Sequence, residues 1–194
     1  MSWQDYFEHH NGLLIDGNRV ECYSYKDKSV IELPANLPMP PTDSFYCMFA
    51  NCHQLQDISA LANWNVSNVK NMQQMFAVCY RLQNITALSN WDTSNVTNMH
   101  GMLSFCHQLQ DISALANWNT SSVEDISNMF YECTRIQDLT ALSNWDTSNV
   151  TNMCGMFSDC HELQDITALS NWKATSVGAV HYMFYNCPKL RYGI

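Results

Sequence analysis

The sequence predicts a repeat solenoid of mixed α/β class, in which each coil holds one short parallel strand and one short helical turn. Two observations lead to this fold class. A Met-Phe pair, with Leu replacing Phe once, returns every 27 residues from Met48-Phe49 to Met183-Phe184 without an insertion. One cysteine follows each pair at a constant distance, from Cys52 to Cys187. Because a single unit cannot bury its apolar side alone, neighbouring units must stack to form the core.

The position of the repeats predicts three parts of the chain. Residues 1–47 lack the repeat, and we expect them to form an N-terminal cap with a short helix from Ser2 to His9 and a hairpin of LLID and RVECYSY. Residues 48–187 hold five coils of 27 residues, and residues 188–194 are expected to close the other end. An uncovered end would expose apolar surface and unpaired backbone groups.

Each unit contains two segments with different apolar spacing. The segment LQDISAL has apolar residues at its first, fourth and seventh positions, and its short length favours a strand. The later segment VSNVKNMQQMF has apolar residues three or four positions apart, which predicts one or two helical turns. Between them, NWNVSN is rich in turn-forming residues. Strands stacked in register would form a parallel ladder with a spacing of about 4.8 Å.

A second period lies on the first. The string HQLQDISALANWN at 53–65 returns at 107–119, and TALSNWDTSNVTNM at 86–99 returns at 140–153. Units therefore resemble the unit two places away more than their neighbours, which indicates duplication of a two-coil module.

Composition and charge limit the function classes. The chain has 194 residues, is 46% hydrophobic and carries a net charge of −9. It has no basic stripe for a phosphate backbone, so we expect no nucleic acid binding, whereas a basic protein partner would fit. The N-terminus lacks the basic start and apolar run of a secretion signal, and no apolar run is long enough to insert into a membrane. A cytoplasmic location is expected, or a surface or secreted one if a leader was removed.

The string LSNWDTSNVTNMxGMFxxC occurs at 142–160 and, with Leu103 in place of Phe, at 88–106. It resembles the leucine-rich repeat of BspA-type bacterial surface proteins and related lipoproteins. This resemblance extends over residues 48–187 and implies a leucine-rich-repeat solenoid of bacterial type, with roles in adhesion or other protein binding. Members of that family are long and exported, whereas this chain is short and shows no leader, so adhesion does not transfer directly.

Two residue ladders have structural explanations that we favour over ligand binding. The repeated cysteines, with His53, His107 and His161 beside them, suggest a metal site, but histidines two coils apart are about 10 Å from one another, too far to share an ion. We expect buried, reduced thiols, except for Cys154 at a polar position, which should react first. The tryptophan repeated from Trp64 to Trp172 is interpreted as a stacked spine, each indole needing one acceptor, rather than a carbohydrate platform.

Two surfaces are candidates for binding a protein. The first holds polar ladders in the predicted strand segment, whose carboxylates could receive lysine or arginine from a partner. The second holds positions at which the repeats differ, where aromatic residues and arginines are typical interface anchors. The first comprises Gln56, Asp57, Gln83, Gln110, Asp111, Gln137, Asp138, Gln164 and Asp165, with Asn84 in the same ladder. The second comprises Tyr80, Arg81, Phe105, Tyr131, Glu132, Arg135, Tyr182 and Tyr185.

No catalytic motif is recognisable. The chain has no nucleophile elbow, phosphate-binding loop or His-Glu zinc motif, so we predict neither enzyme activity nor a cofactor. The prediction is a non-catalytic protein-protein binding module. One alternative is a cytoplasmic immunity or inhibitor protein that neutralises a basic toxin, and another is a surface adhesin-like protein. The sequence does not determine the oligomeric state.

Overall fold

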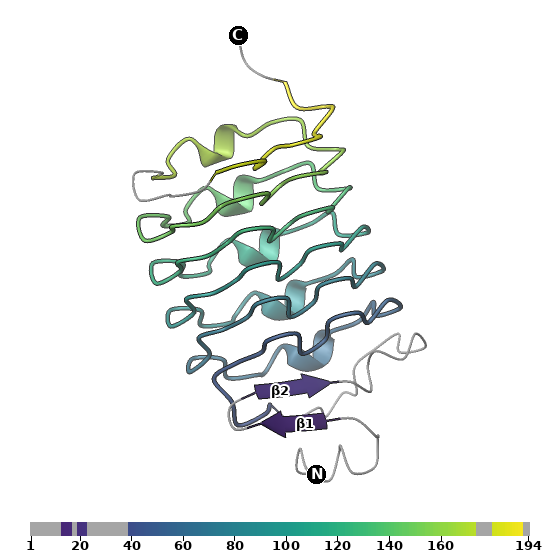
Figure 1. The fold of residues 1–194 in the computed structure, drawn as a ribbon, viewed down its shortest axis with the longest axis vertical. Helices are drawn as coiled ribbons and strands as arrows, with labels where there is room; N and C mark the ends of the chain where they lie inside the picture. Colours follow the sequence, from purple (N-terminus) through teal and green to yellow (C-terminus); the bar gives the residue numbers. More distant parts are fainter. Residues whose placement is uncertain (1–12, 17–18, 23–38, 174–179, 192–194) are drawn as a thin grey trace.

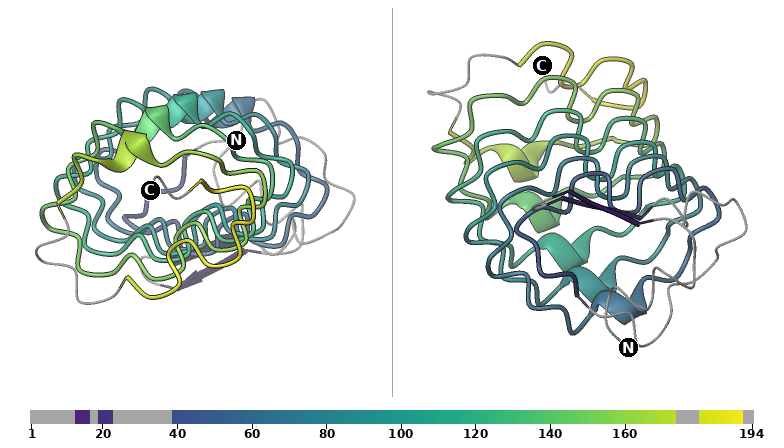
Figure 2. Two further views of the ribbon diagram at one scale, coloured as in Figure 1. Left: turned by 90° about the horizontal axis from the view of Figure 1, so that it is seen from above. Right: turned by 60° about the horizontal axis from the view of Figure 1, so that its bottom comes forward.

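The computed structural model describes residues 13–16, 19–22, 39–173 and 180–191. The chain winds into a stack of coils that rises from the N-terminal end to the C-terminal end (Figure 1). Viewed along the stack, each coil is a flattened loop, with short helices aligned along one long side (Figure 2). The predicted repetitive, stacked architecture is confirmed. No helix in these residues is long and apolar enough to cross a membrane.

Strand β1 (Leu13–Asp16) pairs antiparallel with β2 (Arg19–Cys22), with Leu13 opposite Cys22. These are the two runs from which a hairpin was predicted, and the hairpin lies at the end of the stack beside the first coil (Figure 1). The helix predicted over residues 2–9 lies outside the described residues. The coils contribute the 3₁₀ helices η2 (Ser59–Leu61), η3 (Thr86–Leu88), η4 (Ser113–Leu115), η5 (Thr140–Leu142) and η6 (Thr167–Leu169).

The strand predicted in the LQDISAL segment is wrong, because the 3₁₀ helix of each coil forms there. Leu55, Ile58 and Leu61 are all buried, at a spacing of three residues. In a strand, side chains three residues apart point to opposite faces, whereas here Leu55, Ile58 and Leu61 all enter the core, with Leu61 in the 3₁₀ helix and Ile58 directly before it. In residues 39–173 and 180–191, no strand forms and parallel pairing is limited to isolated bridges, from Ser44–Asn71 to Asp125–Asn152.

The backbone hydrogen bonds between coils lie instead on the opposite side, where helical turns were predicted. We call residues 45–51 and their equivalents in later coils (72–78, 99–105, 126–132, 153–159 and 180–186) the ladder segments. In each coil up to residue 159, alternate N–H groups of the ladder segment donate to the carbonyl 26 residues later, as Phe76 does to Met102 at 2.9 Å. The N–H groups between them close turns within the coil, as Met75 does to Met72 at 3.2 Å.

Two residues in every ladder segment have positive φ. In the second coil they are Gln74 (φ 54°) and Val78 (φ 64°), and in the third Gly101 (φ 59°) and Phe105 (φ 61°). These residues donate across the ladder, as Gln74 does to His100 at 2.8 Å. The left-handed conformation allows consecutive turns to keep every second N–H pointing at the next coil. A regular helix would turn these groups back along its own axis.

One continuous core fills the stack from Phe45 to Leu190. The six repeated cysteines are buried, as predicted, and from Cys79 onward each thiol donates to a carbonyl 30 residues earlier, such as Phe49 O at 3.2 Å. The predicted tryptophan spine is confirmed from Trp118 to Trp172, whose rings stack, and from Trp91 onward each indole Nε1 donates to a carbonyl 30 residues earlier. The indole Nε1 of Trp118 donates to Leu88 O at 2.9 Å, and Trp118 stacks on Trp145 with 6.5 Å between the ring centroids.

The described part of the predicted C-terminal segment, residues 188–191, continues the sixth coil. Leu190 is buried, the Arg191 N–H donates to Gln164 O at 3.2 Å, and Lys189 pairs with Glu162 at 2.6 Å. These contacts join residues 188–191 to the coil before them.

Candidate binding face and its groove

The 3₁₀ helices lie beside two polar columns that run along the stack. We call the ladder of Gln56, Gln83, Gln110, Gln137 and Gln164 the Gln column, and the ladder of Asp57, Asn84, Asp111, Asp138 and Asp165 the Asp column. Together with η2–η6 they form the 3₁₀ face. All members except the half-buried Gln56 are exposed. The residues of the first candidate surface therefore lie on one exposed face, on which 3₁₀ helices form instead of the predicted strands.

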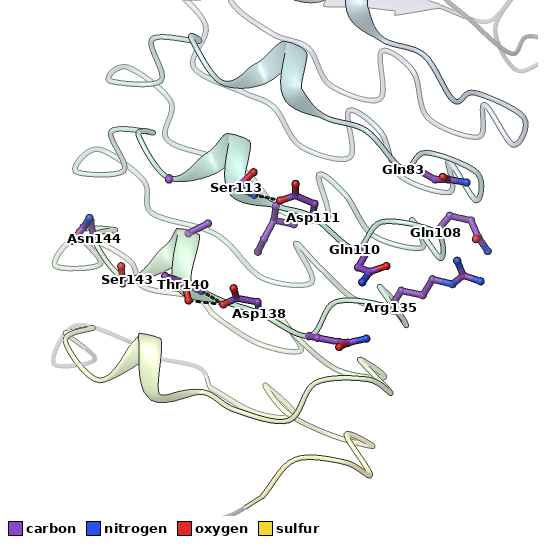
Figure 3. Close-up of a pocket in the computed structure, with 14 residues that line it drawn as sticks. Gln83, Gln108, Gln110, Asp111, Ser113, Arg135, Asp138, Thr140, Ser143 and Asn144 are labelled. Atoms are coloured by element: carbon purple, nitrogen blue, oxygen red, sulfur yellow. Dashed lines mark hydrogen bonds between the residues drawn. The ribbon is translucent and has the colours of Figure 1, made fainter.

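An open groove of about 820 Å³ lies on this face between η4 and η5 (Figure 3). It brings together Gln83, Gln110 and Gln137 of the Gln column with Asp111 and Asp138 of the Asp column. Arg135, which belonged to the second candidate surface, also lines the groove, together with Gln108, Ser143 and Asn144, which the sequence reasoning missed. The available signal for Gln108 was its repeat position, which holds Arg in the coils before and after it.

Each carboxylate of the Asp column has a structural task that uses one of its oxygens. Asp111 Oδ1 accepts the Ser113 N–H at 2.8 Å, and Asp138 Oδ1 accepts the Thr140 N–H at 2.7 Å, so each closes a turn at the start of a 3₁₀ helix. Asn84 makes the same contact with Thr86 at 2.9 Å. The hydrogen bonds from the Ser113 backbone and hydroxyl lower the pKa of Asp111, and those from the Thr140 hydroxyl and backbone lower that of Asp138. Both side chains are thus ionised at neutral pH.

The Gln column has no such task in the described residues, where no hydrogen bond involves the side-chain amide of any of its five members. Arg135 is exposed and also lines a smaller pocket of about 390 Å³ with His161 and Glu162. The groove therefore combines amide donors and acceptors, two carboxylates and one guanidinium on a backbone held by the core. Such a lining suits a polypeptide segment that presents backbone amides and charged side chains.

The second candidate surface is not one site. Tyr80, which is 38% exposed, stacks between His53 and His107 with 4.9 Å between ring centroids on either side. Phe105 meets Tyr131 edge to face at 5.1 Å, and Glu132 lies 3.3 Å from His107 Nε2. Tyr80, Phe105, Tyr131 and Glu132 thus pack against side chains of neighbouring coils. Arg81 is exposed in the second coil, whereas Tyr182 and Tyr185 lie on the sixth. Of the set, only Arg135 reaches the groove.

A group of three or more His, Cys, Asp or Glu side chains placed to hold a metal is not found in the described ranges. Burial raises the pKa of the Cys106 and Cys133 thiols, which keeps them protonated.

This geometry defines a stacked-repeat protein with an open polar groove on one long face. The chain belongs to the family described as Mycoplasma protein of unknown function, DUF285, whose model matches residues 43–141 and 113–194. No curated protein matches the sequence.

One solved structure similar to the chain is a leucine-rich cell surface protein from Faecalibacterium prausnitzii A2-165, with 17% sequence identity and a TM-score of 0.42. The alignment covers 80% of this chain and 45% of that protein, so the chain spans less than half of its length.

Proposed function

We propose that the protein is a non-catalytic protein-binding module and that the groove on its 3₁₀ face is the binding site. The observation that carries the proposal is the row of Gln side-chain amides, which have no hydrogen-bond partner among the residues that the structure describes, beside the carboxylates of the Asp column. Because the core holds the backbone of this face, binding does not have to order a loop, and the ordering cost is limited to the side chains at the interface. The partner is a protein that inserts a segment carrying lysine or arginine between η4 and η5, where it meets Asp111 and Asp138.

The acidic balance of the chain favours one cellular role within this class. A net charge of −9, with the Asp column on the 3₁₀ face, would speed the approach of a basic protein. Of the possible cellular roles, we therefore propose first that the protein is a cytoplasmic inhibitor or immunity protein that neutralises a basic toxin. The surface adhesin-like role rests on a different observation, the WDTSNV and MF motif shared with BspA-type leucine-rich repeats, of which we propose this repeat to be a variant.

The first experiment is affinity capture from an extract of the native organism, with captured proteins identified by mass spectrometry at low and high salt. One stoichiometric basic protein, held less tightly as salt rises, is the expected result. Capture only from surface or host material would replace the inhibitor role with the adhesin-like one. Turnover of a small molecule without any protein partner would contradict the binding module itself.

A charge-matched pair of double variants then tests the groove. Asp111→Asn with Asp138→Asn removes two charges from the groove while Asn keeps the turn, as Asn84 shows. Asp92→Asn with Asp146→Asn removes two charges from turns that do not line the groove, where Asp92 and Asp146 bind the N–H groups of Ser94 and Ser148. We expect the groove variant to bind the captured protein roughly tenfold more weakly, about 1.4 kcal/mol. Equal losses in both variants would show only long-range steering and remove the groove from the proposal.

A further inference from the structure

Arg135 lies where two hollows of the 3₁₀ face meet. Together with Gln110 and Gln137 it lines both the groove and the smaller pocket of about 390 Å³, which we call the side pocket. Because the two hollows share these three residues, they are continuous. Figure 3 shows the Arg135 side chain toward one end of the groove and Asn144 toward the other, with Asp138 between them. The groove therefore has negative charge in its middle and positive charge at the end where the side pocket begins.

The guanidinium of Arg135 has no carboxylate to pair with. Its repeat position holds the uncharged Gln108 in the coil before and Glu162 in the coil after. Glu162 instead pairs with Lys189, at 2.6 Å between Oε2 and Nζ. All residues that line the two hollows lie in the described range 39–173. Among the described residues, the Arg135 guanidinium has no hydrogen bond or ion pair.

The side pocket offers hydrogen-bond donors to an anionic group. A guanidinium presents a planar fork of N–H groups that can bind both oxygens of a carboxylate. The side-chain amides of Gln110 and Gln137 lie beside it and can donate to the same oxygens. The carboxylate that lines the side pocket, Glu162, is already balanced by Lys189. An acidic side chain therefore suits this pocket, whereas a lysine or arginine would meet the like charge of Arg135.

We propose that Arg135 binds a carboxylate of the partner, so that the groove recognises a polypeptide segment carrying both charges. One basic residue of the segment meets Asp111 and Asp138, and an acidic residue a short distance along it enters the side pocket. This role of Arg135 rests on the proposed function and adds to it the acidic position of the segment. A segment with basic residues alone would place like charge beside a guanidinium that nothing neutralises, which lowers its affinity.

Random dodecapeptides displayed on phage serve as the probe. They are selected on the wild-type protein, and those that also bind the double variant Asp111→Asn with Asp138→Asn are removed. The peptides that remain must still bind the double variant Asp92→Asn with Asp146→Asn, so they require the groove and not only the fold or the net charge. We expect these peptides to share an acidic residue at a constant separation from a lysine or arginine.

Two matched variants then test the acidic contact, with the most enriched peptide carrying a fluorescent label and its affinity measured by anisotropy. Arg135→Gln should weaken binding about threefold, the effect of one exposed ion pair. Arg81→Gln should leave the affinity unchanged, because Arg81 is exposed at the same repeat position two coils earlier and lines neither hollow. Gln54 and Gln108 already occupy this repeat position, so glutamine suits the fold at both sites.

The direction of the change in Arg135→Gln separates this role from the proposed function. If the groove bound a basic segment alone, loss of the guanidinium would leave the affinity unchanged or raise it. Either result, or enriched peptides without an acidic residue, would overturn the role of Arg135 and leave the groove as a site for basic segments. A selection that leaves no groove-dependent peptide would overturn both.

Changing the acidic residue of the peptide to its amide tests whether the contact is direct. This change should weaken binding to the wild type about threefold and leave binding to Arg135→Gln unaltered, because the pair is then already broken. Equal losses in the two proteins would place the carboxylate elsewhere and overturn the role of Arg135.

Discussion

Gly101 and Gly155 occupy the repeat position at which the preceding coils carry Gln74 and Asn128. All four have positive φ, so the backbone alone does not require glycine there in every coil. The side chain of the preceding coil supplies the reason. A Cβ on Gly101 would lie 3.2 Å from Gln74 Cγ, and one on Gly155 would overlap Asn128 Oδ1. The large residue of one coil therefore occupies the space left by the glycine of the next, which gives the two-coil period a packing role.

A matched pair of alanine substitutions tests this explanation. Both Gly101→Ala and Gly155→Ala place a side chain in the left-handed region, at a cost of about 1 kcal/mol. Gly155→Ala must in addition move Asn128, so we expect a total of about 2–3 kcal/mol. Urea denaturation of both variants measures the difference. If Asn128→Ala does not relieve the additional cost in Gly155→Ala, the packing explanation fails.

The cysteines differ in burial by repeat position, which predicts their order of reaction. Burial raises the pKa of the Cys79, Cys106 and Cys133 thiols, and these side chains are not accessible. Cys154 is only half-buried and lines a polar pocket with His100 and Asp125. We expect a maleimide at pH 7.5 to label Cys154 before the buried thiols, read by peptide mass spectrometry. Labelling of Cys106 first in the folded protein would contradict this order.

At the scale of the element, asparagine and aspartate side chains close three turns in each repeat from residue 57 to residue 154. In the second and third coils they accept the N–H two residues later at the start of the 3₁₀ helix (Asn84 to Thr86), after the tryptophan (Asp92 to Ser94) and at the start of the ladder segment (Asn98 to His100). Asn and Asp both occur at these positions because the turn needs only an oxygen acceptor. The structure thereby accounts for the Asp column without a ligand, while its second oxygens remain available to one.

These turns predict how stability depends on pH. Hydrogen bonds to the ionised form lower the pKa values of Asp92, Asp111, Asp138, Asp146 and Asp165. A folded-state pKa below the unfolded value of about 3.9 contributes stability above that pH, which is lost as the pH falls through the folded-state pKa. The free energy of unfolding should therefore decrease as the pH is lowered from about 5 to about 3. Thermal unfolding across this range measures it.

Two variants of one turn separate charge from hydrogen bonding. Asp138→Asn keeps the acceptor for Thr140, so near neutral pH it should stay close to wild type and show a weaker pH dependence. Asp138→Ala removes the acceptor, and we expect it to cost about 1 kcal/mol, as for a lost capping residue. Equal destabilisation by both variants at pH 7 would show that the charge, and not the turn, stabilises this position.

At the scale of the whole molecule, stability depends on stacking between neighbouring coils. Phe157 is fully buried between Phe130 and Phe184, whereas Phe184 on the last coil is only partly buried. We expect Phe157→Ala to cost about 4 kcal/mol, because it leaves a cavity inside the stack. Phe184→Ala should cost about 1–2 kcal/mol, since it removes less buried area. Urea denaturation compares the two, and equal costs would mean that the last coil is covered in solution.

The 27-residue period by itself determined that the protein is a stack of coils, because the spacing of Met, Phe, Cys and Trp leaves a one-sided core in each unit. It also determined that the six repeated cysteines are buried and that the Gln and Asp residues form columns along the stack. Only the tertiary structure decided where the backbone pairs. The short segment from Leu55 to Leu61 predicted a strand, but in the structure a 3₁₀ helix forms at its end and all three apolar side chains enter the core. A left-handed backbone conformation is uncommon for residues such as Gln74 and Val78. It becomes favourable in the ladder segments only because the next coil supplies the carbonyls that the N–H groups of these residues reach.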